Sequence, residues 1–222
     1  MHQEVDVANL NLKYASEALG TFILILFGAG ACILAETGFG INHLGVSITF
    51  GLTVFAMVWA FGKVSGAHIN PAVSLAFYLQ RKIPTREFLG YVSFQTLGAI
   101  LAGLVLFFTF PESEGLGGTY PSGAPMESFW TEVWLSFLLM VVILWAISIH
   151  KNIIFIALWI GAIVGLDAYF GGPISGASMN PARSIGPALV SLNLDHIWIY
   201  ILAPCLGTTA AVGAFQLIKR IK

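Results

Sequence analysis

The chain has 222 residues, of which 57% are hydrophobic and only 9% are charged, and its formal net charge is −1. Soluble domains carry charge on about a quarter of their residues, so this composition excludes an ordinary soluble protein and predicts one integral to a lipid bilayer. The net charge itself indicates no partner, and we expect no nucleic acid. Cys32 and Cys205 lie in apolar runs, where they are expected to pack as small hydrophobic side chains rather than to form a disulfide. We expect no metal site and no cofactor.

Six apolar runs are long enough, or nearly so, to cross a bilayer, which takes about 20 residues. The first follows thirteen mostly polar residues, contains Glu17 and is too long for the core of a signal peptide, so we expect it to be retained. The six predicted spans are roughly 14–35, 43–62, 87–109, 128–149, 153–170 and 196–218.

Two further apolar runs, 70–80 and 180–190, are too short to span. Each begins with Asn-Pro-Ala, inside windows at 65–74 and 175–184 that are identical at seven of ten positions and lie 110 residues apart. Asn caps the free N–H groups at a helix start, and Pro is tolerated at the first helical position. Each copy therefore predicts a half-helix that stops near the middle of the membrane. The two motifs are Asn70, Pro71 and Ala72, and Asn180, Pro181 and Ala182.

Three full spans separate the two Asn-Pro-Ala copies. Because three is odd, the second half lies upside down relative to the first, which is an inverted repeat whose re-entrant segments meet near the midplane. We expect one all-α membrane domain over 1–222, with six transmembrane helices, two re-entrant half-helices and repeats at about 10–110 and 127–219. The loop 110–127, rich in Gly, Pro and Ser, connects the halves.

The charges agree with this topology. Of the ten Lys and Arg residues, only Arg183 does not fall on one side, and the opposite loops are acidic. The positive-inside rule then places both termini in the cytoplasm and the loop 110–127 outside. The basic side holds Lys13, Lys63, Arg81, Lys82, Arg86, Lys151, Lys219, Arg220 and Lys222, and the acidic side holds Glu36, Glu112, Glu114, Glu127 and Asp195.

Non-helical backbone at membrane depth is tolerated only where it is buried in protein or lines a water-filled cavity. The segments before the two motifs contain Gly and are followed by Pro, so they are expected to form neither helix nor sheet and to turn their carbonyls toward a pore. The residues predicted to line it are Gly66, Ala67, His68, Ile69, Ser175, Gly176 and Ser178.

Asn70 and Asn180 have two expected roles. Each side-chain oxygen accepts from the N–H groups of its half-helix, which leaves the amide NH₂ free to donate into the pore. Two half-helix N-termini aimed at one point place positive dipole ends there, which repel cations and protons while neutral solutes pass. The alternative is a pair of structural caps in a fold without a conduit.

Five ionisable residues are candidates for a role at membrane depth. Arg183 follows the second motif, where a buried charge is costly and usually functional, unless it snorkels to the interface. Glu17 and Glu132, near the starts of the first and fourth spans, are expected to bind and shape the re-entrant backbone, with a proton relay as the alternative. His68 is expected to be a brace or pore wall rather than a pH gate. Asp167 stays open between loop bracing and the pore edge.

Segments 17–22 (EALGTF), 65–73 (SGAHINPAV) and 172–184 (GPISGASMNPARS), together with Glu132, resemble the aquaporin or major intrinsic protein family over essentially the whole chain. Paired Asn-Pro-Ala boxes with a following Arg are the most specific part of this resemblance. It implies an aquaporin-like channel domain and a homotetramer with one pore per subunit, multi-pass in a plasma or inner cell membrane.

The resemblance also places a narrow selectivity filter on Phe50, Ala168, Ala177 and Arg183. Water-specific relatives usually carry His at the second position and a small polar residue at the third. Glycerol channels place aromatics at the first and third positions and Asp after the Arg, where this chain has Ser184. Ala168 and Ala177 predict a wider, less polar opening, nearest to the plant nodulin-like branch and its bacterial relatives. That branch carries water with small uncharged solutes such as glycerol, urea or metalloid hydroxides.

Two function classes compete. The first is a passive channel for water and small uncharged solutes that excludes protons and ions. The second is an ion- or proton-coupled secondary transporter, because inverted repeats with broken helices occur there too, with Glu17 and Glu132 as the only symmetric acidic pair. We expect no enzyme, because the sequence has no cluster of nucleophile, base or metal ligands.

Overall fold

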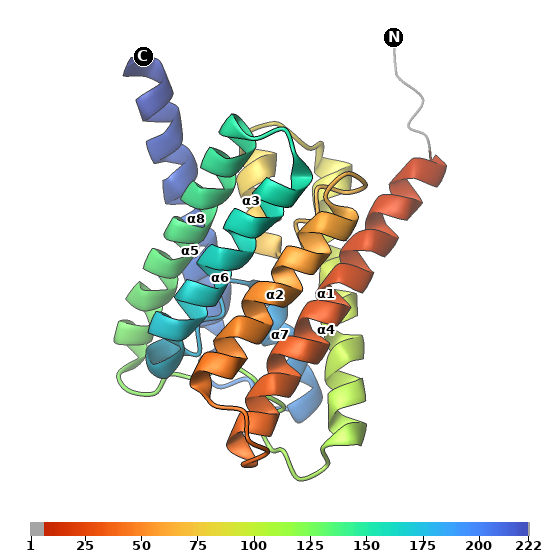
Figure 1. The fold of residues 1–222 in the computed structure, drawn as a ribbon, viewed down its shortest axis with the longest axis vertical. Coiled ribbons are helices and arrows are strands. Elements are labelled where there is room, and N and C mark those ends of the chain that lie inside the picture. Colours follow the sequence, from red (N-terminus) through yellow and green to blue (C-terminus); the bar gives the residue numbers. More distant parts are fainter. Residues whose placement is uncertain (1–6, 222) are drawn as a thin grey trace.

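The computed structural model describes residues 7–221 of the chain, with side chains over 9–218. Within these residues there are eight α-helices and no strand (Figure 1). Six of them, α1, α2, α4, α5, α6 and α8, are long and apolar enough to cross a membrane, which confirms the predicted fold class. The helices are α1 (Val7–Glu36), α2 (His43–Phe61), α3 (Pro71–Leu79), α4 (Thr85–Thr109), α5 (Pro125–Ile149), α6 (Ile153–Ser175), α7 (Pro181–Ser191) and α8 (Ile197–Ile221).

The two short helices, α3 and α7, enter the bundle from opposite ends (Figure 1). Each starts at the Pro that follows its Asn, and they have nine and eleven residues. Eleven residues rise about 17 Å, roughly half of the ~30 Å hydrocarbon layer. Asn70 Oδ1 accepts from the N–H of Ala72 at 2.9 Å, and Asn180 Oδ1 accepts from that of Ala182 at 3.1 Å. The side-chain caps expected at both half-helices are therefore present.

Helix α6 is longer than the predicted span 153–170, because it continues through Pro173 to Ser175. Proline has no N–H, so the Tyr169 carbonyl four residues earlier loses its partner in the helix. His43 Nε2, at the start of α2, donates to that carbonyl at 2.7 Å. The sequence pattern predicts that the helix ends before Gly171, whereas in the structure the helix continues past Pro173.

Helices α2 and α6 cross at two glycines, Gly51 and Gly161, which are 110 residues apart and so equivalent in the two halves. A Cβ added to Gly161 would lie 2.6 Å from the Gly51 carbonyl oxygen, and one added to Gly51 would lie 2.8 Å from the Gly161 oxygen. The backbones of the two halves therefore touch at this crossing, and neither position has room for a side chain. Elsewhere α1 packs on α4, and α5 packs on α8.

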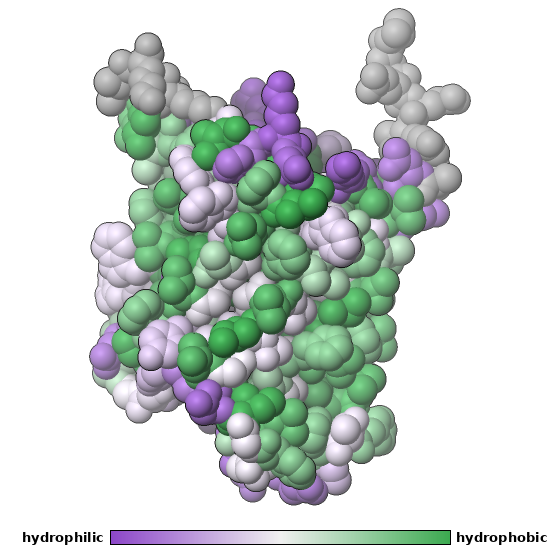
Figure 2. Space-filling view, in the orientation of Figure 1, coloured by the Kyte–Doolittle hydropathy of each residue, from purple (hydrophilic) through white to green (hydrophobic). Residues whose placement is uncertain are grey.

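The bundle has an apolar belt between two hydrophilic ends (Figure 2). Helix α1 begins and α8 ends at the same end of the molecule (Figure 1). The side chains of Lys219 and Arg220 and all of Lys222 lie outside the described part. Of the other basic residues expected on one side, the end where α1 begins carries Lys13, Lys63, Arg81, Lys82, Arg86 and Lys151, and the opposite end carries Glu36, Glu112, Glu114, Glu127 and Asp195.

The Gly51–Gly161 crossing gives a stability prediction. Gly161→Ala should destabilise the protein by about 1–3 kcal/mol, because the new methyl group meets backbone that cannot move aside. Gly213→Ala is the matched control, since a Cβ there meets nothing within 4 Å and Ala is the better helix former. Thermal unfolding of both variants in detergent measures the difference. Equal midpoints for the two variants would contradict the contact.

Candidate pore and selectivity site

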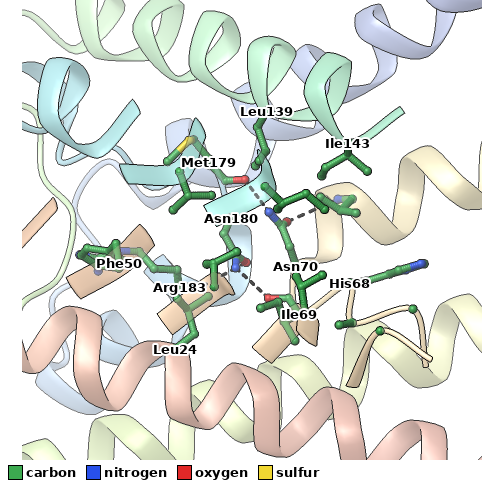
Figure 3. A pocket seen from close by; sticks show the side chains of 18 of the residues that line it. Leu24, Phe50, His68, Ile69, Asn70, Leu139, Ile143, Met179, Asn180 and Arg183 are labelled. Atoms are coloured by element: carbon green, nitrogen blue, oxygen red, sulfur yellow. Dashed lines mark hydrogen bonds between the residues drawn. The ribbon is translucent and has the colours of Figure 1, made fainter. Parts of the chain in front are cut away.

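The two half-helices meet end to end through their asparagines (Figure 3). Asn70 Nδ2 donates to the carbonyl of Met179 at 2.8 Å, and Asn180 Nδ2 donates to the carbonyl of Ile69 at 2.8 Å. The expectation that each amide NH₂ is wholly free is therefore wrong, because one of its two hydrogens is bound to the opposite loop. Each amide has a second N–H that no described group accepts, and both asparagines line a cavity.

Glu17 holds the first re-entrant loop. Its carboxylate is fully buried and accepts from Ser65 Oγ at 2.6 Å, from the N–H groups of His68 and Ile69 at 2.9 and 2.6 Å, and from Gln95 Nε2 at 2.7 Å. A carboxylate is an acceptor only, so four donors saturate it.

Glu132 holds the second loop in the same way. It accepts at 2.7 Å from Ser175 Oγ and from the N–H groups of Ser178 and Met179, and it too is fully buried. In both loops the residue before the Asn has a left-handed backbone, with φ of +42° at Ile69 and +53° at Met179. Such angles are unfavourable for these side chains, and the N–H bonds to the buried carboxylates hold them.

The cavity at this junction has a volume of about 290 Å³ and is lined by residues of both halves. Its polar wall is formed by 66–70, 177–180 and Arg183. The remaining wall is apolar, with Leu24, Phe50, Val54, Val58, Gly62, Val73, Phe77, Leu139, Ile143, Ile147, Ile153, Ile156, Ile160 and Val164. Leu139 and Ile143 of α5 lie beside Asn70 and Met179 in Figure 3.

Ser175 and Gly176, which were predicted to line the pore, do not line this cavity. Ser175 ends α6, its hydroxyl binds Glu132, and its carbonyl accepts from Tyr200 Oη at 2.8 Å. The lining of the second loop begins instead at Ala177 and includes Met179. Sequence reasoning missed Met179, although the 110-residue offset pairs it with Ile69, which was predicted.

Arg183 lies beside the cavity with only 2% of its surface exposed. Its Nη1 donates to the carbonyl of Gly117 at 2.8 Å, and its Nη2 lies 3.8 Å from Cys32 Sγ. The guanidinium carbon is 5.2 Å from the ring centroid of Phe50. Within the described residues its Nε has no hydrogen-bond partner. The arginine is thus held against the wall and does not snorkel to the interface.

Of the four predicted filter residues, Phe50, Ala177 and Arg183 line the cavity and Ala168 does not. Ala168 is buried, and it follows Val164, the last lining residue of α6, by one helical turn. Its methyl group is shorter than the side chains of Ile160 and Val164, which precede it at four-residue intervals on α6. The 110-residue offset pairs Ala168 with Val58, which does line the cavity.

His68 and Asp167 have different surroundings. His68 lines the cavity, its Nδ1 lies 3.1 Å from Ser74 Oγ, and its ring stacks on Phe77 at a centroid distance of 4.6 Å. Asp167 is buried outside the cavity lining, and its Oδ2 has no partner among the described residues. The structure therefore gives His68 the contacts of a brace and a wall, and it places Asp167 outside the cavity lining.

The profile of the major intrinsic protein family matches residues 4–216. The chain belongs to this family. It is 42% identical over 210 residues to aquaporin NIP1-1 of Zea mays, covering 93% of this chain and 74% of that one. It is 39% identical over 221 residues to aquaporin NIP3-1 of Arabidopsis thaliana, covering 95% and 68% of the two chains. It is 37% identical over 210 residues to nodulin-26 of Glycine max, covering 93% and 78%.

The fold of this major intrinsic protein is similar to the X-ray structure of the aquaglyceroporin from Plasmodium falciparum, with a TM-score of 0.86. That likeness covers 96% of this chain and 98% of the other at 24% identity, so it supports the fold alone.

The buried carboxylate of Glu132, which accepts three hydrogen bonds, gives a second prediction. Glu132→Gln replaces one acceptor oxygen by an NH₂ group that faces an N–H donor, which should destabilise the protein by about 3 kcal/mol and disorder the second loop. Glu114→Gln, at an exposed position of the connecting loop, is the control and should leave stability unchanged. Thermal unfolding and solute flux in vesicles measure both effects. Full stability of Glu132→Gln would exclude the bracing role.

Proposed function

We propose that the cavity is part of a pore through which water and small uncharged solutes cross the membrane passively. The observation that carries this proposal is the end-to-end contact of α3 and α7, with the Asn70 and Asn180 amides beside the cavity. A solute at this point meets amide donors and loop carbonyls on one wall and aliphatic side chains on the other. No enzymatic step belongs to this function.

Ions and protons are excluded for an electrostatic reason. The two helix N-termini direct their positive dipole ends at the same place, which opposes any cation. The aliphatic wall offers no ligands to replace the water shell of an ion, so its entry is costly. A neutral solute loses fewer hydrogen bonds on entry and regains some at the polar wall.

The solute range follows from the size of the opening near Arg183. We place the filter at Phe50, Ala168, Ala177 and Arg183, where two of the four side chains are single methyl groups. Glycerol, urea and metalloid hydroxides fit the description of small polar solutes with room to pass. Larger side chains at Ala168 and Ala177 would block the passage of these solutes.

An ion-coupled transporter is the weaker candidate. It needs an acidic coupling site, and the symmetric pair Glu17 and Glu132 is the only one in the sequence. Glu17 is saturated by four donors, and Glu132 accepts from three, which are the Ser175 hydroxyl and two N–H groups of the second loop. A coupling ion would have to displace bonds that hold the pore in shape.

The assembly and placement in the cell are part of the same proposal. We propose a homotetramer with one pore in each subunit, in which each chain is one channel domain of two repeats at about 10–110 and 127–219. The basic end of the bundle faces the cytoplasm in a plasma or inner cell membrane, together with both termini. The other partners are water, the solutes and the bilayer.

The function is tested by osmotic swelling of proteoliposomes, with water, glycerol and urea run in parallel. Flux should exceed that of empty vesicles, persist when ion gradients are collapsed, and carry no current in a planar bilayer. A proton or sodium current that scales with solute flux would contradict the passive channel and favour the transporter.

The filter is tested by the double variant Ala168→His with Ala177→Thr. The larger side chains should narrow the opening opposite Phe50, so glycerol permeability should fall about tenfold and water permeability less than about threefold, where tenfold equals ~1.4 kcal/mol of barrier. Stopped-flow light scattering on vesicles with equal amounts of each protein measures both. If the parent passes neither glycerol nor urea, the wide filter is wrong and the protein passes water alone.

A further inference from the structure

The loop that connects the two halves is bonded at three points to α6 and α7, the helices on either side of the second re-entrant loop. The Gly117 carbonyl accepts from Arg183 Nη1 at 2.8 Å. Thr119 Oγ1 lies 2.6 Å from Ser184 Oγ, and Ser122 N–H donates to the Ile174 carbonyl at 3.1 Å. These contacts hold the connecting loop, which joins α4 to α5, against the residues around the proposed filter.

Gly117 fits its place closely. Its φ of +61° favours glycine, and a Cβ there would lie 2.2 Å from the Ala29 carbonyl oxygen of α1. Leu116 beside it is 1% exposed. The loop is therefore seated between α1 and the second half-helix, and its carbonyl at Gly117 is fixed in position for Arg183.

Thr119 is the first member of a buried chain of hydroxyl groups. Ser184 Oγ lies 2.6 Å from both Thr119 Oγ1 and Ser178 Oγ, and Ser178 Oγ donates to the Asn180 carbonyl at 2.9 Å. A carbonyl only accepts, so the order Thr119 to Ser184 to Ser178 to Asn180 gives each of the three hydroxyl hydrogens an acceptor. The Asn180 carbonyl thus sets the direction of the chain, Thr119 is its outermost donor and ties the connecting loop to Ser184, and Ser178 lines the cavity.

The first half of the protein contains the equivalent arrangement with a different third member. There Ser74, the equivalent of Ser184, contacts His68 Nδ1 at 3.1 Å and donates to the Asn70 carbonyl at 3.1 Å. Its third partner is Gln95 of α4, whose Nε2 donates to Ser74 Oγ at 3.0 Å. A donor held by a transmembrane helix therefore completes the first half-loop.

Among its described side chains, helix α8, the equivalent of α4, offers Ser184 no such donor. Tyr91 of α4 and Tyr200 of α8 are equivalent, because their hydroxyls bind the carbonyls of Ser65 and Ser175, and they are 109 residues apart. The same offset pairs Gln95 with residue 204 (95 + 109), which is proline. Proline has no side-chain donor, and Thr119 supplies it from the connecting loop.

We propose that Thr119 is a positioning residue of the filter. It holds Ser184 through its hydroxyl, and with Gly117 it keeps the Arg183 guanidinium against the cavity wall. This inference rests on the proposed channel function. Without the Thr119 hydroxyl the loop loses its bond to Ser184, and only the bond of Gly117 to Arg183 still joins it to α7. Arg183 then moves into the opening, where it obstructs glycerol more than water.

The test compares Thr119→Val, which keeps the shape and removes the hydroxyl, with Thr119→Ser, which keeps the hydroxyl. The glycerol-to-water permeability ratio should fall about fivefold in Thr119→Val, as the loss of one buried hydrogen bond allows, and return to the parent value in Thr119→Ser. Ser113→Ala, in the same loop, is the control, because its buried Oγ has no partner among the described residues. Unchanged selectivity in Thr119→Val, or no rescue by Thr119→Ser, would overturn the proposal.

Hydrogen–deuterium exchange on the same proteins in detergent provides a readout that does not need flux. Thr119→Val should speed exchange in peptides covering 176–186, and Thr119→Ser should not. If the parent passes no solute, the channel function fails, and exchange in 176–186 still decides whether Thr119 positions the loop. If Thr119→Val does not fold, Ser184→Ala removes the same bond from the other side and must lower the permeability ratio as well; an unchanged ratio there would overturn the proposal.

Discussion

The reciprocal bonds between Asn70 and Met179, and between Asn180 and Ile69, are the constraint on which the rest of the structure depends. Each asparagine caps its own half-helix with its oxygen and holds the opposite loop with its nitrogen. Neither half can complete its own loop, because the donor for each loop carbonyl comes from the other half. The inverted arrangement of the two halves is therefore required for both loops to be complete. The backbone contact of Gly51 with Gly161 brings the halves close enough for these bonds to form.

Some of the backbone polar groups in the two re-entrant loops are bonded to the protein, and others are left for a solute. Glu17 and Glu132 take the N–H groups of the two loops. The asparagines take one carbonyl from each loop, and the remaining carbonyls and amide hydrogens are those that a solute can use. Unsatisfied polar groups in hydrocarbon cost several kcal/mol each, so the buried carboxylates are what makes an irregular loop stable at this depth.

Much of the fold could be predicted because the spans and the Asn-Pro-Ala motifs are local signals. The end of α6 could not, since the group that replaces the bond lost at Pro173 is His43, 126 residues earlier. The error at Ser175 has the same origin: the motif resembles a loop, while the residue still belongs to the helix. Position 168 shows a different limit, because the family resemblance assigns a residue to the filter and the neighbouring side chains decide whether that residue reaches the cavity. Thr119 lies in a loop whose composition indicates only flexibility.

The places where the two halves differ separate the selective part of the proposed pore from the symmetric part. Valine at 73 has Arg183 as its equivalent, His68 has Ser178, and the donor Gln95 is replaced by one from the connecting loop. The symmetric asparagines and helix dipoles select solutes by their charge, and they act equally on a solute that enters from either end of the pore. Discrimination between neutral solutes depends on the width of the pore and on directed hydrogen bonds. A filter repeated symmetrically in both halves would only present the same opening a second time. The second half therefore differs from the first where it forms the filter, and the contacts that hold it there come from outside the repeat. The connecting loop, which belongs to neither repeat, supplies these contacts.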